Sequence, residues 1–292
     1  MNKHKKSFNQ LSDLKNILPA NYKSEVNDNS RSQQLQDSIS PHANLGLLFY
    51  KKYFEDLKLE YLLLPEKNPS KEREKLEKEN AEEIKKRNRR LIENCPLWII
   101  DNEIADKYLI PLTVSYPGLI TGVGINHEAG IEGEFKLGVH FDYTYGMPVV
   151  YGSSVKGVLK TFFADFLKEM HQGLDAVAFE KDIFEGQNNN GNKSIYDRDI
   201  FFDAVIVNAN KKSKILDSDT LCPHDENPLK NPIPISFLKI ASGVKMEFRF
   251  KLVNSKIGEE TFNADDKKKL FEKILTTVGI GAKTNVGYGQ LK

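Results

Sequence analysis

The feature that most constrains the fold is a run of apolar side chains at helical spacing in the second half of the chain. These side chains recur every three or four residues over about four turns, the pattern of a helix with one buried face. Ser153 and Ser154 directly precede the run, and either is a suitable N-cap. The sequence therefore predicts an amphipathic helix that begins near these serines. Its apolar positions are Val155, Val158, Leu159, Phe162, Phe163, Phe166, Leu167 and Met170.

The segments around this helix place it in an alternating order of strands and helices. Residues 108–116 and 244–252 alternate between apolar and polar positions, and residues 200–207 are almost continuously apolar, as in a buried strand. A second helix is predicted from about residue 264 to residue 278, with Asn263 as its cap. Since residues 244–252 are apolar on one side only, their other side is expected to face solvent.

The end of the chain completes the order. Residues 288–291 follow the second helix as a short closing strand, whereas the proline-rich residues 208–235 are predicted to form a long loop. The order strand, helix, strand, strand, helix, strand is that of the split βαβ, or ferredoxin-like, arrangement. We therefore predict an α+β, ferredoxin-like domain over residues 96–292, with both helices on one face of its sheet.

Residues 1–95 differ from the rest of the chain in composition and periodicity, and they are predicted to form a helical, partly flexible extension. Residues 1–40 are polar and show no sustained period, with at most a short helix near Leu11–Leu18. Residues 44–64 carry apolar side chains at helical spacing, which predicts a packed helix that ends near Pro65.

A strongly charged arm follows. Between residues 66 and 93, 18 of the 28 residues are charged, which is typical of a solvated helix or a disordered insertion. Leu76, Ile84 and Leu91 leave a thin apolar seam along this arm. A solvated helix is favoured over a helix that docks on a partner.

Charge and composition limit the classes of function. The chain has 42 basic and 41 acidic residues and a net charge of +1, whereas a dedicated nucleic-acid binder usually has a clear basic excess. Any contact with nucleic acid must therefore be local or shared with a partner. No apolar run is long enough for a membrane helix, and the first residues lack the apolar core of a secretory signal. Cys95 and Cys222 cannot build a disulfide framework, so a cytoplasmic location is expected.

Two glycine-containing segments fail the tests for familiar catalytic or nucleotide-binding motifs. In the glycine-rich ending, Thr284 stands where a dinucleotide fingerprint needs its third glycine, and the segment follows a helix instead of opening one. In GSSVKG, Lys156 stands where a nucleophile elbow needs glycine. Both segments nevertheless suit phosphate: the first offers a helix start with two lysines, and the second offers close backbone approach. A plain helix start and a tight turn are the simpler alternatives.

The histidines and cysteines give no stronger candidate. His127 and Glu128 lack the second histidine of a zinc hydrolase motif, and Cys222 with His224 supplies only two metal ligands. His140 lies two residues before Asp142, so an acid–base pair is conceivable, although a lone histidine near an aspartate is usually structural. No metal and no cofactor are expected.

Two segments resemble the signatures of a known family. GSSVKGVLKTFF after YGMPVVY, and the ending GIGAKTNVGYGQL, are similar to the two motifs of the RAMP proteins, the RNA-binding subunits of type III CRISPR–Cas effector complexes. Tyr151 stands where the family usually has proline. LDSDTLCPHDENP and PIPISFLKIASGVKMEFRFKL resemble the sixth subunit of the Cmr, or III-B, complex. The resemblance covers about residues 108–292, and the charged arm has no counterpart.

This resemblance implies a non-catalytic subunit that caps one end of the complex backbone and holds the 3′ part of the guide RNA for antiviral defence. Guide RNA, target RNA, and the backbone and small subunits of the complex are the implied partners, with no membrane contact. A RAMP-class endoribonuclease and a protein-binding scaffold are the alternatives. The two signatures are expected to form one cleft. The expected RNA-binding residues are Gly152, Ser153, Ser154, Lys156, Lys160, Gly279, Gly281, Lys283, Thr284, Asn285, Gly287 and Tyr288.

Overall fold

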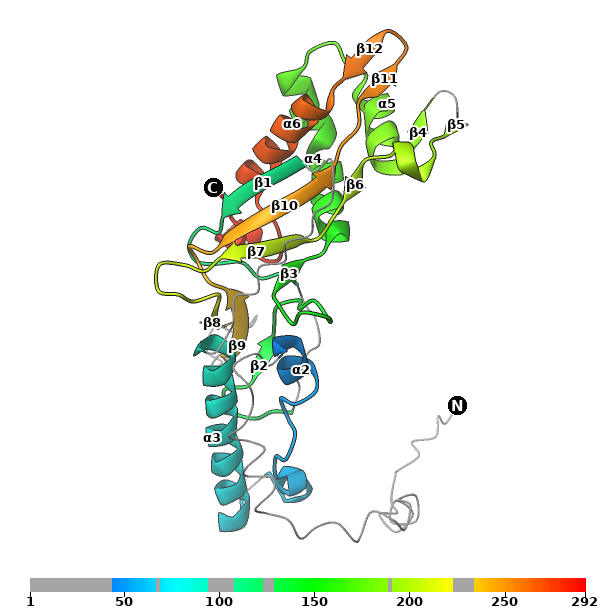
Figure 1. Ribbon diagram of the computed structural model, residues 1–292. Coiled ribbons are helices and arrows are strands. Elements are labelled where there is room, and N and C mark those ends of the chain that lie inside the picture. Colours follow the sequence, from blue (N-terminus) through cyan, green and yellow to red (C-terminus); the bar gives the residue numbers. More distant parts are fainter. Residues whose placement is uncertain (1–43, 67–68, 94–107, 123–128, 189–190, 223–233) are drawn as a thin grey trace, which may run out of the picture. The chain divides into compact units, whose positions relative to one another are not determined.

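The computed structural model describes residues 44–66, 69–93, 108–122, 129–188, 191–222 and 234–292 (Figure 1). The short helix predicted near Leu11–Leu18 lies outside the described residues, as do Cys95, His127, Glu128 and His224. Within the described ranges, no helix has the length and apolar character needed to cross a membrane.

The main sheet is antiparallel and has the order β1-β10-β7-β3, with β6 pairing β10 beside β7 (Figure 1). The end of the chain extends it, because Leu291 bridges Val114 and Lys292 exchanges two backbone hydrogen bonds with Thr113, at 2.7 and 3.0 Å. The closing segment, β1, β10 and β7 thus lie in the order of a split βαβ sheet, which confirms the predicted fold. The strands are β1 (Tyr108–Thr113), β3 (Val149–Val150), β6 (Ile200–Phe201), β7 (Ala204–Asn208) and β10 (Lys245–Lys251).

Helices α4 (Gly152–Met170) and α6 (Ala264–Val278) contact each other on one face of this sheet (Figure 1). The ring of Phe271 from α6 lies 5.5 Å from that of Phe250 in β10. Asn263 caps α6 as predicted, since its side chain accepts a 2.8 Å hydrogen bond from the Asp266 backbone. The buried side chains of α4 are Val155, Leu159, Phe163 and Leu167, all from the predicted apolar face.

The opposite face of β10 is less open than its alternating pattern predicts. Arg249 is only 8% exposed, and its Nε donates a 2.8 Å hydrogen bond to Glu247. Met147 and Val149 line a cavity of about 330 Å³ with Arg249 and Val205, so the segment before α4 screens this side of the sheet. The alternating pattern of a strand does not predict whether a segment distant in sequence covers its polar side.

A second sheet occupies part of the region predicted to be a loop. Strand β8 (Leu216–Leu221) pairs antiparallel with β9 (Ile235–Ile240), and β2 (Phe135–Leu137) pairs parallel with β9. The loop prediction was wrong over residues 216–221 because the sequence LDSDTL has low β-propensity. Its polar side chains are stabilised across the sheet, as when Lys239 Nζ binds Asp219 at 2.6 Å.

The N-terminal helices of the described chain are shorter and more packed than predicted. Helix α2 (Leu45–Tyr50) stops well before Pro65, and the 3-10 helix η3 (Leu59–Leu63) follows it. The charged arm forms α3 (Lys71–Glu93), as the helical alternative predicts. Its seam is buried, not solvated, with Ile84 0% and Leu91 2% exposed within the apolar core. A domain boundary after residue 95 stays a prediction.

Lys267 of α6 lies at the centre of a buried ionic network. Its Nζ is fully buried and donates to Asp199 Oδ2 at 2.8 Å, to the Val253 carbonyl at 2.6 Å and to Ser255 Oγ at 2.8 Å. The Ser255 hydroxyl in turn contacts Asp182. The remaining short elements are α5 (Ala176–Glu180), the π-helical turn η4 (Lys181–Glu185), β4 (Gln187–Asn188), β5 (Gly191–Asn192), η5 (Ile195–Asp197), β11 (Ser255–Ile257), β12 (Glu260–Phe262) and η6 (Thr284–Val286).

Candidate nucleic-acid interface

The start of α4 is capped by a residue from another strand. Tyr151 is the N-cap and makes no side-chain cap hydrogen bond, so the prediction of Ser153 or Ser154 as N-cap was wrong. Instead, Asp203 Oδ1 accepts a 2.6 Å hydrogen bond from the Gly152 N–H. A carboxylate here is stabilised by the positive end of the helix dipole, as a phosphate would be. Part of the predicted phosphate site is therefore occupied by the protein itself.

Gly152 is required by packing. It is buried, and a Cβ at this position would collide with the Phe201 carbonyl and lie 2.9 Å from the carbonyl carbon of Phe202. Because β6 ends at Phe201 and β7 begins at Ala204, the strand break between them both approaches the helix and delivers Asp203. The aspartate that interrupts the apolar run IFFDAVIV was the only sequence signal for this cap.

The two lysines of the helix start also have partners within the chain. Lys160 Nζ lies 2.7 Å from Glu185 Oε1, and this hydrogen bond raises the pKa of Lys160. Lys156 Nζ lies 5.8 Å from the centre of the Phe201 ring, a cation–π distance. Of the predicted residues here, Ser153 is exposed and Ser154 is half-buried.

The glycine loop, residues 279–289, is held by backbone contacts. Gly281 has a φ of 94°, and a Cβ there would collide with the Ile120 carbonyl. Gly287 also has a positive φ, 95°, but the nearest atom to its Cβ position is Pro117 Cδ at 3.7 Å. Gly279 and Gly289 resemble Gly281, since a Cβ at either would meet the backbone of the loop itself. Three of the four glycines are thus explained by packing, and Gly287 is not.

The tip of the glycine loop presents polar side chains to solvent. Lys283 and Asn285 are exposed, Thr284 is half-buried, and Lys283 adopts the left-handed conformation at φ 60°. No ion pair is found for Lys283 among the described residues. The tip is closed by hydrogen bonds from the Val286 and Tyr288 amides to the Lys283 carbonyl, at 3.1 and 3.3 Å. A cation is therefore displayed on an ordered turn.

Tyr288 anchors this loop to the second sheet. Its side chain is 6% exposed, and its hydroxyl donates a 2.8 Å hydrogen bond to Asp219 Oδ2, the oxygen that also binds Lys239. Burial and the Asp219 carboxylate raise the pKa of Tyr288 to about 12. Its ring packs against Phe237 at 5.8 Å, edge to face. In this structure Tyr288 positions the loop and does not face solvent.

The two signatures rest on different neighbours. The helix start contacts Phe201 to Asp203, whereas the glycine loop is bound to the segment after β1, with hydrogen bonds from Gly289 N–H to Gly118 and from Ala282 N–H to Ile120. In the described part of the chain, no hydrogen bond joins residues 152–160 to residues 279–289. A single cleft between them stays a prediction.

Among the described residues, His140 and Asp142 have different partners and no hydrogen bond joins them. Asp142 Oδ1 accepts hydrogen bonds from the amides of Thr144 and Tyr145 at 2.9 and 2.7 Å, so it closes a turn. His140 stacks on Tyr151 at 4.7 Å between ring centres, and burial lowers its pKa. The carboxylate therefore does not orient the imidazole, which an acid–base pair would require. Among the described residues, no three ligating side chains are placed to hold a metal ion.

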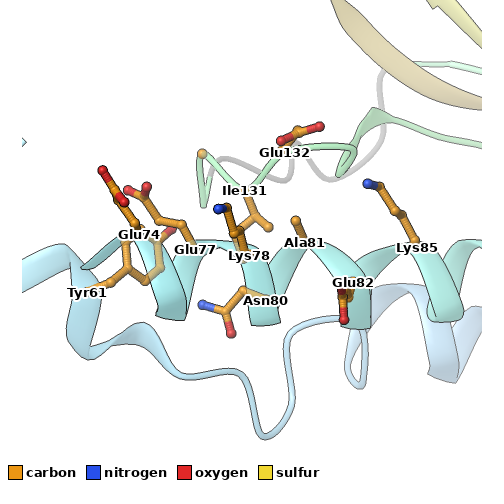
Figure 2. A pocket seen from close by; sticks show the side chains of 11 residues that line it. Tyr61, Glu74, Glu77, Lys78, Asn80, Ala81, Glu82, Lys85, Ile131 and Glu132 are labelled. Carbon is orange, nitrogen blue, oxygen red and sulfur yellow. The ribbon is translucent and has the colours of Figure 1, made fainter. Parts of the chain in front are cut away.

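A separate hollow of about 440 Å³ lies between α3 and residues 130–132 (Figure 2). Glu74, Glu77, Lys78 and Lys85 line it from the helix, and Glu132 lies across from them in Figure 2. It contains none of the predicted RNA-binding residues. Its mixed charges favour neither an anion nor a cation.

Comparison with known proteins now identifies the family. The sequence model of the RAMP superfamily matches residues 5–292. The chain belongs to the RAMP superfamily. No curated protein sequence matches this RAMP protein.

Two solved structures are similar to this RAMP protein. One is a chain of the cryo-EM structure of the type III-B Cmr-beta bound to cognate target RNA, with 20% identity, 85% of each chain covered and a TM-score of 0.47. The other is the crystal structure of Cmr6 from Pyrococcus furiosus, with 19% identity, 64% of this chain and 99% of that chain covered, and a TM-score of 0.34.

Proposed function

We propose that this RAMP protein is a non-catalytic RNA-binding subunit of a type III-B CRISPR–Cas effector complex, where it caps the backbone and holds the 3′ part of the guide RNA. The observation that carries the proposal is the glycine loop, which displays exposed Lys283 and Asn285 on a turn fixed by backbone packing and by Tyr288. An exposed cation held on an ordered turn is suited to phosphate. Membership of the RAMP superfamily supports RNA as the source of that phosphate.

The near-neutral charge is compatible with this role. In a complex of several subunits, each chain covers only a few nucleotides, so a small number of local cations is sufficient. The net charge of +1 argues against a long RNA footprint on this chain alone. We infer that this chain contacts guide RNA and target RNA over a short stretch. Neighbouring backbone and small subunits of the complex would supply the other contacts to these RNAs.

RNA binding across a salt series tests the proposal. Lys283→Ala should weaken binding of single-stranded RNA and reduce the slope of log affinity against log salt by about 0.7, the value for one phosphate contact. Lys256→Ala removes an exposed lysine of β11 and is the matched control, with an unchanged slope. Equal slopes for wild type and Lys283→Ala would contradict the proposed site.

Isolation of the natural assembly tests the proposed complex. The tagged full-length chain, purified from its host, should carry other type III-B subunits and RNA of guide sequence. Sequencing of the bound RNA distinguishes guide RNA from bulk cellular RNA. Recovery of the protein with partners but without RNA would favour the scaffold alternative.

Incubation with labelled RNA tests the non-catalytic part of the proposal. The geometry supports it because Asp142 closes a turn and leaves His140 without a carboxylate that orients it. We expect no specific cleavage with or without magnesium. Specific cleavage that His140→Ala abolishes would favour the endoribonuclease alternative.

A further inference from the structure

Tyr116 is the most exposed large apolar side chain in the described part of the chain. Its side chain is 86% exposed, immediately after the bridge that joins Val114 to Leu291. An aromatic ring that is left in water contributes little to the core. Packing therefore does not explain why an aromatic residue stands here.

The backbone that carries this ring is hydrogen-bonded on one side to the last residue of the glycine loop and on the other side to the residue that follows the loop. The Ser115 N–H donates a 2.8 Å hydrogen bond to the Gln290 carbonyl, and the Gly118 carbonyl accepts one of 2.8 Å from Gly289. Between them, Pro117 is the nearest neighbour of the open Cβ position of Gly287. The exposed ring is thus presented from a fixed backbone at the edge of the loop.

Two other tyrosines are similarly exposed but differ in setting. Tyr143 is 80% exposed, yet its ring lies 6.2 Å from that of Tyr50. Tyr196 is also 80% exposed, and its carbonyl accepts a hydrogen bond from Lys251, at the end of β10 opposite to Lys245. Lys245 pairs with Thr113, beside the segment that carries Tyr116. Tyr116 therefore combines an exposed ring with attachment to the glycine loop.

We infer that Tyr116 is a stacking platform for one unpaired RNA base, next to the phosphate contact of the glycine loop. The inference rests on the proposed function and adds to it a base-contacting residue. Every base has an aromatic face, so such a platform binds single strands with little sequence preference, whereas the faces of a base inside a duplex are covered by its stacked neighbours. Lys283 takes the phosphate, and Tyr116 takes a base beside it.

Fluorescence of an RNA that carries 2-aminopurine tests the stack, with the full-length protein and its variants. Wild type should bind single-stranded RNA and quench the probe at one position. Tyr116→Ala should bind roughly 5- to 150-fold more weakly and lose that quenching, because one stacked base has about that effect. Tyr116→Phe should retain both properties. Tyr196→Ala, the matched control, should behave like wild type.

The outcomes separate this inference from the proposed function. If wild type binds RNA and Tyr116→Ala binds and quenches equally well, the stacking inference is overturned and the proposed function stands. If Tyr116→Ala and Tyr196→Ala lose affinity to the same extent, the ring of Tyr116 contributes no more than another exposed tyrosine ring. The inference is then also overturned. If wild type does not bind single-stranded RNA, both fail. Thermal unfolding of Tyr116→Ala should match wild type, since the ring is exposed.

Discussion

The start of α4 and the glycine loop carry the two sequence signatures of the family, but the fold uses their polar groups in different ways. At the helix start, Asp203 accepts from Gly152 and Glu185 binds Lys160. At the loop, the frame is fixed by glycine packing while Lys283 remains exposed. A signature can therefore encode packing in one place and an exposed cation in another.

The largest expected effect tests whether the glycine loop is held by packing. Gly281→Ala should lower the free energy of unfolding by more than the roughly 1–3 kcal/mol of a strained φ, because its Cβ also meets the Ile120 carbonyl. Denaturant unfolding measures the loss. Gly157→Ala is the control, since this exposed helical glycine has nothing near its Cβ position and should gain about 0.5–1 kcal/mol. A Gly281→Ala protein as stable as wild type would contradict the packing explanation.

Substitution of the capping residue Asp203 tests whether the start of α4 serves the fold and not RNA binding. Asp203→Asn should lower the free energy of unfolding by about 1 kcal/mol, because it weakens a charged cap at the start of α4. Asp197→Asn changes an exposed aspartate and should leave stability unchanged. RNA affinity should not rise in Asp203→Asn, since Lys160 keeps its ion pair with Glu185. A clear rise would show that the helix start is a masked phosphate site.

Lys160 and Lys283 are expected to differ in how much each contributes to RNA affinity. Lys160→Ala should leave RNA affinity and its salt dependence near wild type, because the ammonium group is already paired with Glu185. Lys283→Ala should reduce the salt slope by about 0.7. Filter binding of both variants over one salt series decides between them. A larger effect from Lys160→Ala would reverse the roles of the two signatures.

The last expected effect concerns the anchor of the loop and depends on pH. Tyr288→Phe should lower the free energy of unfolding by about 1 kcal/mol at neutral pH, the value of one hydrogen bond. The pKa of Tyr288 is raised from 10.0 to about 12, so its contribution is present below pH 10 and lost as pH rises through 12. The difference between wild type and Tyr288→Phe should therefore shrink over that range. Tyr116→Phe removes an exposed hydroxyl and is the control.

The sequence was informative wherever stability is local or periodic. The helix over residues 155–170, the Asn263 cap and the buried face of residues 244–252 all follow from spacing alone. Strand β8 did not, because Asp219 is stabilised by Lys239, 20 residues away, and by Tyr288, 69 residues away. Similarly, α2 ends at Tyr50, and the chain then turns before Asp56, which has a positive φ of 57°.

The same distinction applies to the candidate site. Local motifs were sufficient to select Gly152, Lys160 and Lys283 for attention. Which of these groups is satisfied within the chain depends on Asp203 and Glu185, whose positions are set by a strand break and by the turn after α5. The role that we infer for Tyr116 was not predicted, because one tyrosine at the end of a strand carries no motif.

The buried network at Lys267 sets the register of α6. The ammonium group has three hydrogens, and Asp199, Val253 and Ser255 supply three acceptors for it. A shift of the helix by one residue in one direction would bring Asp266 toward Asp199, with like charges facing each other. The apolar face of α6 alone would select its position less strictly.

That register reaches the other end of the helix. The 15 residues of α6 span about 22 Å, and the glycine loop begins where they end, at Gly279. The position of the glycine loop therefore depends on the buried ion pair of Lys267 near the first turn of α6. A buried ion pair at one end of α6 thus helps to fix the placement of an exposed loop at the other end.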